Sequence, residues 1–333
     1  MKKLIIPALL IAGSFLFSCQ QHQYIKLEGF TQGTIYKITY ENQNGIVYEE
    51  EIKQLFQDFS ASLSTYLSTS LISRINQNDT TVVIDDYFRT MFNKAAEVNK
   101  ESEGVFDITI APIVNLWGFG FTGNTPDIHQ DKIDSLLQCV GMNKIRIEGD
   151  RVVKDSPGVM LDGNAIAKGF SVDVVADFLK NKGCRNFLVN VGGEIVAHGV
   201  NPDGHVWYIE IEKPIENAVW GASKIAVVRL NNRAMATSGN YRRFFEIDGK
   251  KYGHTFDVKT GYPATTDLLS ATIVADDCIT ADAWATVCLA SGLAKSIQIL
   301  QQHSELDALL IYSDEKGDFK VHVTEGMNAI ILK

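Results

Sequence analysis

Short strand candidates joined by tight turns limit the folds that this chain can adopt. Two of the turns, Glu148-Gly149-Asp150 and Asp248-Gly249-Lys250, are typical of β-hairpins because glycine reaches the positive φ angles that such turns need. Hairpins join antiparallel strands, so an antiparallel or mixed sheet is favoured over a doubly wound parallel one. The strand candidates are residues 30–40, 144–147, 151–153, 186–191, 206–212, 224–230, 269–275 and 308–312.

Segments with apolar residues at helical spacing alternate with these strands. No internal repeat and no Pro/Gly/Ser-rich linker divides the chain, so no boundary inside the folded part can be drawn from composition. We therefore predict an α+β fold in which helices pack against antiparallel or mixed sheets. The helical segments are residues 47–59, 85–100, 127–140, 165–182, 281–291 and 294–303.

The amino terminus has the pattern of a bacterial signal peptide. Lys2 and Lys3 precede an apolar run that is shorter than the ~20 residues of a transmembrane helix. The run ends in Leu16-Phe17-Ser18-Cys19, which resembles a lipobox with an imperfect Phe17. An ordinary signal peptide with an incidental cysteine is the alternative. We predict a lipoprotein signal peptide over residues 1–18, lipidation of Cys19, a lipid-anchored tether over 19–28, a folded domain over 29–333, and export to the periplasmic side of a bacterial membrane.

Net charge and cysteine spacing exclude some classes of function. The net charge of −9 and the lack of a Lys/Arg stripe argue against a nucleic-acid partner. The remaining cysteines form no CxxC pair and have no histidines at zinc-site spacing, which favours buried thiols. A disulfide stays open in an exported protein. These cysteines are Cys139, Cys184, Cys278 and Cys288.

The segment Ala281-Asp282-Ala283-Trp284-Ala285-Thr286 combines a carboxylate and a hydroxyl on a helix of small residues. Asp282 and Thr286 are four residues apart and therefore share one helical face. They offer oxygen ligands of the kind that Mg²⁺ prefers, and the alanines leave room for a ligand. An aspartate near a helix start that acts as a cap or dipole partner is the alternative.

A second segment, Leu161-Asp162-Gly163-Asn164-Ala165-Ile166-Ala167-Lys168-Gly169, runs from a strand into a helix. Such a junction presents free backbone N–H groups, and together with Lys168 it could hold a diphosphate. A tight turn with a solvated lysine is the alternative. Asp173 is either an ion-pair partner of Lys168 or a supporting group behind it.

Two further segments carry candidate chemistry. His254 and Asp257 precede the turn at Gly261-Tyr262-Pro263, where a histidine can assist proton transfer and an aspartate can orient it, although such a pair is also common in surface loops. Gly192-Gly193-Glu194 follows an apolar strand, which indicates either close backbone approach to a ligand or a bulge.

Taken in order, these segments resemble the ApbE family of FAD:protein FMN transferases. The resemblance covers almost all of the chain after the leader, and the lipobox agrees with exported members of the family. The blocks that carry it are Gly33-Thr34-Ile35-Tyr36, Leu63-Ser64-Thr65-Tyr66, Ser73-Arg74-Ile75-Asn76, Gly104-Val105-Phe106-Asp107-Ile108-Thr109, Pro112, Leu116-Trp117-Gly118-Phe119-Gly120, Ala167-Lys168-Gly169, Gly192-Gly193-Glu194, Thr237-Ser238-Gly239-Asn240-Tyr241, His254, Thr260-Gly261-Tyr262-Pro263 and Ala281-Asp282-Ala283.

The resemblance implies a T-fold-like α+β core with FAD bound in a cleft between two halves. It implies a magnesium ion held by Asp282, Thr286 and the main-chain carbonyl of Ala165, with Lys168 and the 237–241 turn, including Ser238 and Gly239, near the diphosphate. His254 would assist deprotonation of the incoming hydroxyl. The flavin and adenine pockets would be lined by Gln32, Tyr66, Phe106, Asp107, Ile108, Asp162 and Phe256.

The sequence departs from the family pattern at two of these places. Many relatives carry Met where Gln32 stands, and Asp-Pro where Asp257-Val258 stands. The first departure could alter a flavin contact. The second removes a rigid residue from the turn and keeps the carboxylate.

The implied reaction is Mg²⁺-dependent transfer of FMN from FAD to a threonine or serine hydroxyl of an acceptor protein, with release of AMP. The implied acceptor is a subunit of a membrane redox complex, such as a sodium-pumping NADH:quinone reductase or an Rnf-type complex. A FAD pyrophosphatase that gives FMN and AMP, and a periplasmic FAD-binding lipoprotein without turnover, remain as alternatives. A direct role in thiamine synthesis ranks lowest, since no residue here indicates that chemistry.

Overall fold

The computed structural model describes the chain from residue 23 almost to its end, namely residues 23–42, 45–123, 126, 128–214, 224–239, 244–247, 250–314, 316 and 318–332. The predicted signal peptide over 1–18 and the lipidation site Cys19 lie outside the described residues and stay predictions. Asn240 and Tyr241 of the predicted diphosphate turn also lie outside them.

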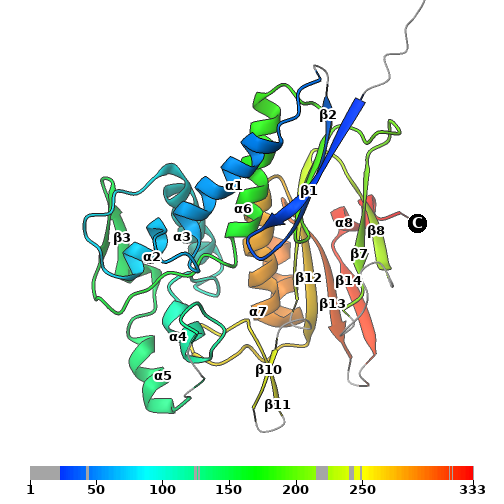
Figure 1. The fold of residues 1–333 in the computed structure, drawn as a ribbon. Coiled ribbons are helices and arrows are strands. Elements are labelled where there is room, and N and C mark those ends of the chain that lie inside the picture. Colours follow the sequence, from blue (N-terminus) through cyan, green and yellow to red (C-terminus); the bar gives the residue numbers. More distant parts are fainter. Residues whose placement is uncertain are drawn as a thin grey trace, which may run out of the picture.

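An eight-stranded antiparallel sheet forms the centre of the molecule (Figure 1). Its strands lie in the order β1-β2-β5-β6-β9-β12-β13-β14, and every neighbouring pair is antiparallel. The predicted α+β fold with antiparallel sheets is confirmed. The strands are β1 (Gln23–Thr31), β2 (Thr34–Asn42), β5 (Phe187–Val191), β6 (Glu194–His198), β9 (Arg233–Gly239), β12 (Leu268–Ala275), β13 (Asp307–Ser313) and β14 (Phe319–Val323).

Three two-stranded hairpins lie outside this sheet: β3 (Ile145–Glu148) with β4 (Arg151–Lys154), β7 (Trp207–Glu212) with β8 (Lys224–Leu230), and β10 (Phe244–Ile247) with β11 (Lys250–Gly253). The predicted hairpin around Gly149 is confirmed, and Gly149 has φ +58° as the turn requires. The other predicted hairpin is confirmed by the pairing of β10 with β11, although its turn residues 248–249 lie outside the described part.

Helices pack around the sheet, and most begin or end near a predicted boundary. The two helices predicted over 281–291 and 294–303 are confirmed as the two parts of α7, which is interrupted at Gly292, where the backbone is not helical and φ is +76°. α7 is long and apolar enough to cross a membrane by length and composition, yet it packs as a core helix against α6, β9 and β12. The helices are α1 (Glu49–Leu63), α2 (Leu71–Asn76), α3 (Asp86–Glu101), α4 (Ala111–Leu116), α5 (Gln130–Leu137), a 3₁₀ turn (Met142–Lys144), α6 (Ala167–Asn181), α7 (Cys278–Gln302) and α8 (Glu325–Ile330).

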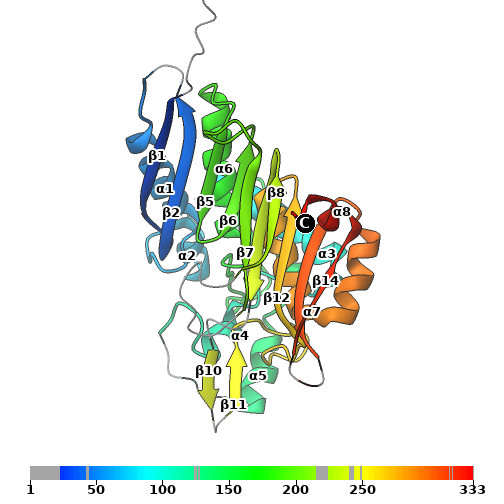
Figure 2. The ribbon, with the colours of Figure 1, turned by 90° about the vertical axis from the view of Figure 1, so that its right-hand side faces the viewer.

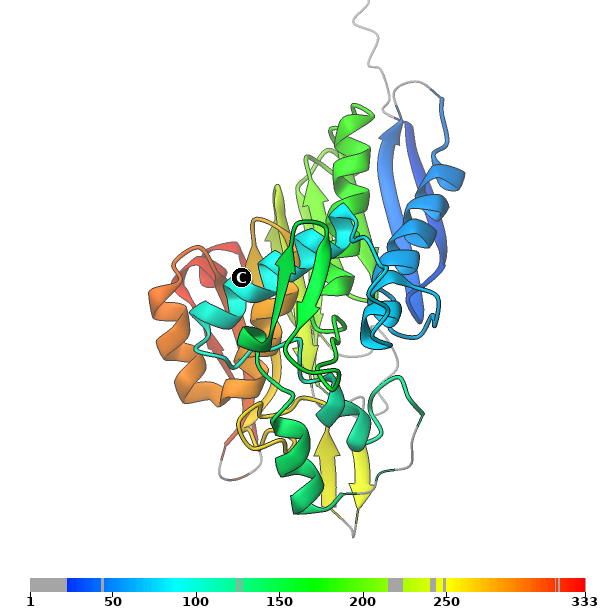
Figure 3. The same cartoon turned by 90° about the vertical axis from the view of Figure 1, so that its left-hand side faces the viewer.

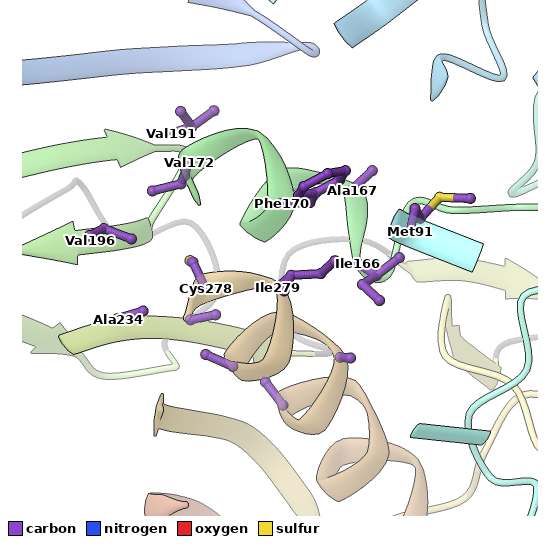
Figure 4. Close-up of a cluster of buried hydrophobic side chains, with 14 of the residues drawn as sticks. Met91, Ile166, Ala167, Phe170, Val172, Val191, Val196, Ala234, Cys278 and Ile279 are labelled. Atoms are coloured by element: carbon purple, nitrogen blue, oxygen red, sulfur yellow. The ribbon is translucent and has the colours of Figure 1, made fainter. Parts of the chain in front are cut away.

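The two faces of the sheet are covered differently. Helices α6 and α7 cover one face, where Phe170, Cys278 and Ile279 belong to one buried cluster with Val196 and Ala234 of the strands (Figure 4). Full burial of a large apolar side chain such as Phe or Ile contributes about 1.5–3 kcal/mol to the stability of the fold. The β7–β8 hairpin and α8 cover the opposite face (Figures 1 and 2). Helix α5 and the β10–β11 hairpin lie together at one end of the molecule (Figure 3).

The start of the folded part differs from the prediction. The strand predicted over residues 30–40 is a hairpin of β1 and β2, and the turn residues Gln32 and Gly33 have φ of +48° and +75°. The folded part begins before residue 29, because Gln23 already pairs with Asn42. An edge strand keeps polar residues on its exposed side, so β1 lacks the apolar signal that would have marked it as a strand.

Candidate active site

A cavity of about 1740 Å³ lies where the ends of the central strands meet the amino-terminal turns of α6 and α7. Fourteen of the residues predicted from sequence line it together, from segments far apart in the chain. Their individual roles stay predictions. They are Gln32, Tyr66, Phe106, Asp107, Ile108, Asp162, Ala165, Lys168, Ser238, Gly239, His254, Phe256, Asp282 and Thr286.

Asp282 is held beneath the amino terminus of α6. Its carboxylate is almost fully buried and accepts a hydrogen bond of 2.9 Å from the Gly169 N–H, an amide that has no partner within its own helix. Glycine is required at position 169 because an added Cβ would lie 2.2 Å from the Cys278 carbonyl oxygen. The cap of α7 is Asp277, whose side chain accepts from the Thr280 N–H. Asp282 is therefore not the cap of its own helix, but it caps an amino-terminal amide of α6, so the capping alternative holds for the neighbouring helix.

Oxygen atoms of three kinds line the cavity: the Asp282 carboxylate, the Thr286 hydroxyl and the main-chain carbonyl of Ala165. Thr286 lies one turn further along α7, and its hydroxyl is 3.2 Å from the Ser238 hydroxyl. The carbonyl of Ala165 accepts no hydrogen bond from any described residue. The described residues contain no group of three His, Cys, Asp or Glu side chains suited to a metal, which argues against a zinc-type site there. A carboxylate, a hydroxyl and a free carbonyl instead fit a hard cation such as Mg²⁺.

Lys168 and Glu194 both line the cavity and form an ion pair with each other. Burial lowers the pKa of the Lys168 amine, but the negative charges of Glu194 and Asp282 outweigh burial and leave that pKa above its usual range. Burial raises the pKa of Asp282 to about 6, although the charge of Lys168 opposes the shift. The second oxygen of Glu194 is buried without a hydrogen-bond partner. Two buried carboxylates thus share one ammonium group, an arrangement that favours an additional cation.

Glu194 is a site residue that the sequence did not assign. Gly192 and Gly193 form a two-residue hairpin turn between β5 and β6, with φ of +65° and +110°, so the bulge alternative is wrong. Both glycines line the cavity, which agrees with the predicted close backbone approach to a ligand. The turn places Glu194 at the start of β6, opposite Lys168. A carboxylate directly after a Gly-Gly turn at the end of an apolar strand was the available signal.

Asp173 is not the ion-pair partner of Lys168. Its two carboxylate oxygens accept hydrogen bonds of 2.8 Å from the N–H groups of Cys278 and Ile279, which caps the start of α7 from α6. Burial raises the pKa of Asp173 to about 7. The residue therefore sets the position of α7 and, through it, of Asp282.

We expect Asp173→Ala to lower the free energy of unfolding by about 2–4 kcal/mol, because two buried N–H groups lose their acceptors at ~1–3 kcal/mol each. Asp177→Ala is the matched control, since Asp177 lies on the same helix with an exposed side chain and should change stability by less than ~0.5 kcal/mol. Urea unfolding followed by circular dichroism measures both. Equal stability of the two variants would show that the cap does not hold α7.

The residues predicted to line the flavin and adenine pockets differ in solvent exposure and in the hydrogen bonds that they already make within the protein. Tyr66 is 65% exposed and presents its ring at the cavity. The Nε2 atom of Gln32 is buried without a hydrogen-bond partner. The Asp107 carboxylate already accepts from the N–H and hydroxyl of Thr109, at 2.8 and 2.5 Å, and from the Met142 N–H at 3.1 Å. Asp107 therefore shapes the wall of the cavity through these bonds.

The predicted pairing of His254 with Asp257 stays a prediction. His254 is exposed at the cavity, with its ring centroid 6.4 Å from that of Phe119. The Asp257 carboxylate accepts from the Lys259 N–H at 2.8 Å, and Asp257 is not among the residues that line the cavity. An aspartate that bonds the amide two residues later stabilises its own turn, so one oxygen of this carboxylate is used within the turn that precedes Gly261.

The four cysteines of the described chain are free thiols. Cys184, Cys278 and Cys288 are buried, and Cys139 is half-buried. Burial raises the pKa of Cys288 to about 12, so this thiol stays protonated. The favoured interpretation of buried, unpaired cysteines is confirmed for three of the four.

Comparison with known proteins places this fold and cavity in one family. The model of the ApbE family matches residues 32–310. A FAD:protein FMN transferase of Haemophilus influenzae is 36% identical, with 94% of each chain covered. One from Vibrio cholerae is 34% identical over 93% of this chain and 94% of its own length.

Solved structures give the same answer. The flavin transferase ApbE from Vibrio cholerae superimposes with a TM-score of 0.83 at 33% identity, over 93% of this chain and 99% of its own. The flavinyl transferase ApbE from Pseudomonas stutzeri has a TM-score of 0.83 at 29% identity, over 93% and 97%. Because the family model spans most of the chain and the relatives match nearly end to end, this chain belongs to the ApbE family.

Proposed function

We propose that this protein is a Mg²⁺-dependent transferase that moves FMN from FAD onto a threonine or serine hydroxyl of an acceptor protein and releases AMP. The observation that carries the proposal is the buried Asp282 carboxylate, which lines one cavity together with Thr286, Ala165 and the Lys168–Glu194 pair. The cavity of about 1740 Å³ is large enough to hold a dinucleotide. The relatives are named for this same reaction.

In this reaction the acceptor hydroxyl oxygen bonds to the FMN-side phosphorus as the bridging P–O bond of FAD breaks. A Mg²⁺ ion held by Asp282, Thr286 and the Ala165 carbonyl would neutralise the charge of the diphosphate. Lys168 holds a second positive charge at the same place, because its ammonium group stays protonated beside two carboxylates. His254, exposed at the cavity, is the candidate to accept the proton of the hydroxyl.

The acceptor and the location of the enzyme belong to the same proposal. A flavin-carrying subunit of a sodium-pumping NADH:quinone reductase or of an Rnf-type complex is the proposed acceptor, because the family resemblance points to membrane redox subunits. A lipid anchor on Cys19 would hold the enzyme on the membrane surface beside it. Globomycin treatment of cells that express the protein tests the anchor, since it blocks lipoprotein signal cleavage and should leave an unprocessed precursor.

The direct test is to incubate residues 20–333 with FAD, Mg²⁺ and a purified Rnf-type flavin subunit domain. The mass of the acceptor and the nucleotide products are then followed. A gain of one FMN per acceptor with release of AMP supports the transferase. Free FMN and AMP without labelled acceptor would favour the pyrophosphatase, and intact FAD would point to a binding protein.

Removal of divalent metal should stop the reaction and lower stability. We expect EDTA to abolish transfer, Mg²⁺ to restore it, and saturating Mg²⁺ to stabilise the folded protein, by about 2.7 kcal/mol at 100 times the dissociation constant. The reason is that Mg²⁺ binds the folded site, where two buried carboxylates share one ammonium group. Thermal unfolding with and without Mg²⁺ measures the shift. Transfer at full rate in EDTA would contradict a metal role.

A further inference from the structure

Within the described part of the chain, strand β7 has one edge without a partner strand. It pairs with β8 on one side only, and no backbone group among the described residues bonds to its other side. The orientation of that edge follows from the register. Glu210 stands opposite Val227. The Val227 carbonyl accepts from the Leu332 N–H and therefore points away from β7.

Because the backbone carbonyl of Val227 points away from β7, Val227 and Glu210 form a non-hydrogen-bonded pair of the antiparallel ladder. The N–H and C=O of Glu210 therefore point away from β8, and those of Tyr208 do the same, two residues earlier. The amides of Ile209 and Ile211 bond to β8, and their side chains pack in the core against the central sheet. The open edge thus presents a ready row of backbone donors and acceptors.

This open edge forms a wall of the cavity that holds the candidate active site. Residues 208–212 all line the cavity, from both faces of the strand, as expected when the edge itself faces inward. Ile209 belongs to the same buried cluster as Ile195, which directly follows Glu194, the partner of Lys168. The Glu210 side chain is exposed and paired with Lys224, so its charge is partly neutralised at the edge.

We propose that the acceptor protein docks as an extended segment that pairs with the open edge of β7 and so delivers its hydroxyl side chain into the cavity. This inference rests on the proposed transfer reaction and adds its mode of acceptor recognition. Backbone pairing supplies affinity with little dependence on side chains, while the cavity selects a residue that carries a hydroxyl. The acceptor is the occupant because a segment on this edge lies inside the reaction cavity, where the second substrate has to enter.

The test uses a pair of substitutions at one position. Glu210→Pro removes the open-edge N–H and keeps the pairing with β8, since proline is tolerated where the N–H faces outward. Glu210→Ala keeps that N–H and removes the same side-chain charge. We expect Glu210→Pro to raise KM for the Rnf-type flavin subunit domain by roughly threefold to tenfold, because the loss of one hydrogen bond weakens binding by about that factor. Glu210→Ala should leave this KM within about twofold, and KM for FAD should stay unchanged in both variants.

A second measurement covers the case in which Glu210→Pro does not fold. Amide hydrogen exchange of the wild-type protein with FAD is compared with and without an acceptor domain whose target threonine is replaced by valine. The amides of Tyr208 and Glu210 should exchange more slowly with the acceptor present, whereas those of Ile209 and Ile211 are protected already.

Several outcomes would overturn the proposal. Equal acceptor KM for the two variants together with unchanged exchange at Tyr208 and Glu210 would do so. A change of oligomeric state in Glu210→Pro without a change in acceptor KM would instead assign the edge to a second copy of this chain. Absence of labelled acceptor with the wild-type enzyme would contradict the transferase proposal itself, and the exchange measurement would still decide whether the edge binds the acceptor domain.

Discussion

Asp282→Asn is expected to fold normally and to lose Mg²⁺-dependent FMN transfer, with kcat lower by roughly 10²–10³-fold or more. Asparagine keeps an oxygen that can accept from the Gly169 N–H, so the contact between α6 and α7 is preserved. It removes the negative charge that would bind the cation. The loss should therefore appear in kcat and in Mg²⁺ binding, measured by single-turnover kinetics and by titration calorimetry.

Asp277→Asn is the matched control for this variant. It makes the same chemical change five residues earlier in the same helix start, at the N-cap of α7. Asparagine caps helices as well as aspartate does, so both stability and transfer should stay near wild type. If Asp282→Asn bound Mg²⁺ and transferred FMN like Asp277→Asn, the proposed metal site would be wrong.

Lys168→Met is the second substitution with a large expected effect, and it should reduce both stability and activity. It leaves the Glu194 carboxylate buried without the ammonium group that pairs with it, and breaking a buried pair costs ~3–5 kcal/mol. We expect the free energy of unfolding to fall by about 3 kcal/mol, the low end of this range, because the Lys168 side chain is 35% exposed to solvent. Transfer should fall by roughly 10²-fold, since a positive charge at the diphosphate is lost.

The double variant Lys168→Met with Glu194→Gln separates these two effects. Neutralising Glu194 removes the unpaired buried charge, so most of the lost stability should return while transfer stays low. Urea unfolding and the transfer assay are measured on all three variants. Recovery of activity together with stability would mean that Lys168 acts through folding alone and does not meet the diphosphate.

Secondary structure was predictable wherever burial leaves a period in the sequence. Helix α3 alternates buried and exposed positions at helical spacing, and its aspartate cap stands at residue 85, so both its existence and its start were predicted. Strands β6 and β9 were not predicted. β6 is buried on both faces, and β9 carries small residues such as Ala234 and Ala236, so neither shows the alternation that marks a strand.

The residues of the candidate site also fall into two groups: those that a local sequence pattern indicated and those that depend on tertiary contacts. The spacing of Asp282 and Thr286 places them on one helical face whatever the rest of the fold does, and so the sequence indicated the cation ligands. The partners of Lys168 and Asp173 depend on contacts between α6, β6 and α7. Such contacts leave no local pattern. Glu194 was consequently missed.

The sequence by itself determined the fold class, the family and the residue types of the site, because hairpin turns, helical spacing and ordered motifs are local properties of the chain. Only the tertiary structure decided which charges meet. It set Lys168 between two buried carboxylates, used Asp173 to hold α7, and left one edge of β7 open toward the cavity. These features arise from the packing of segments distant in sequence, whose mutual distances no local pattern encodes.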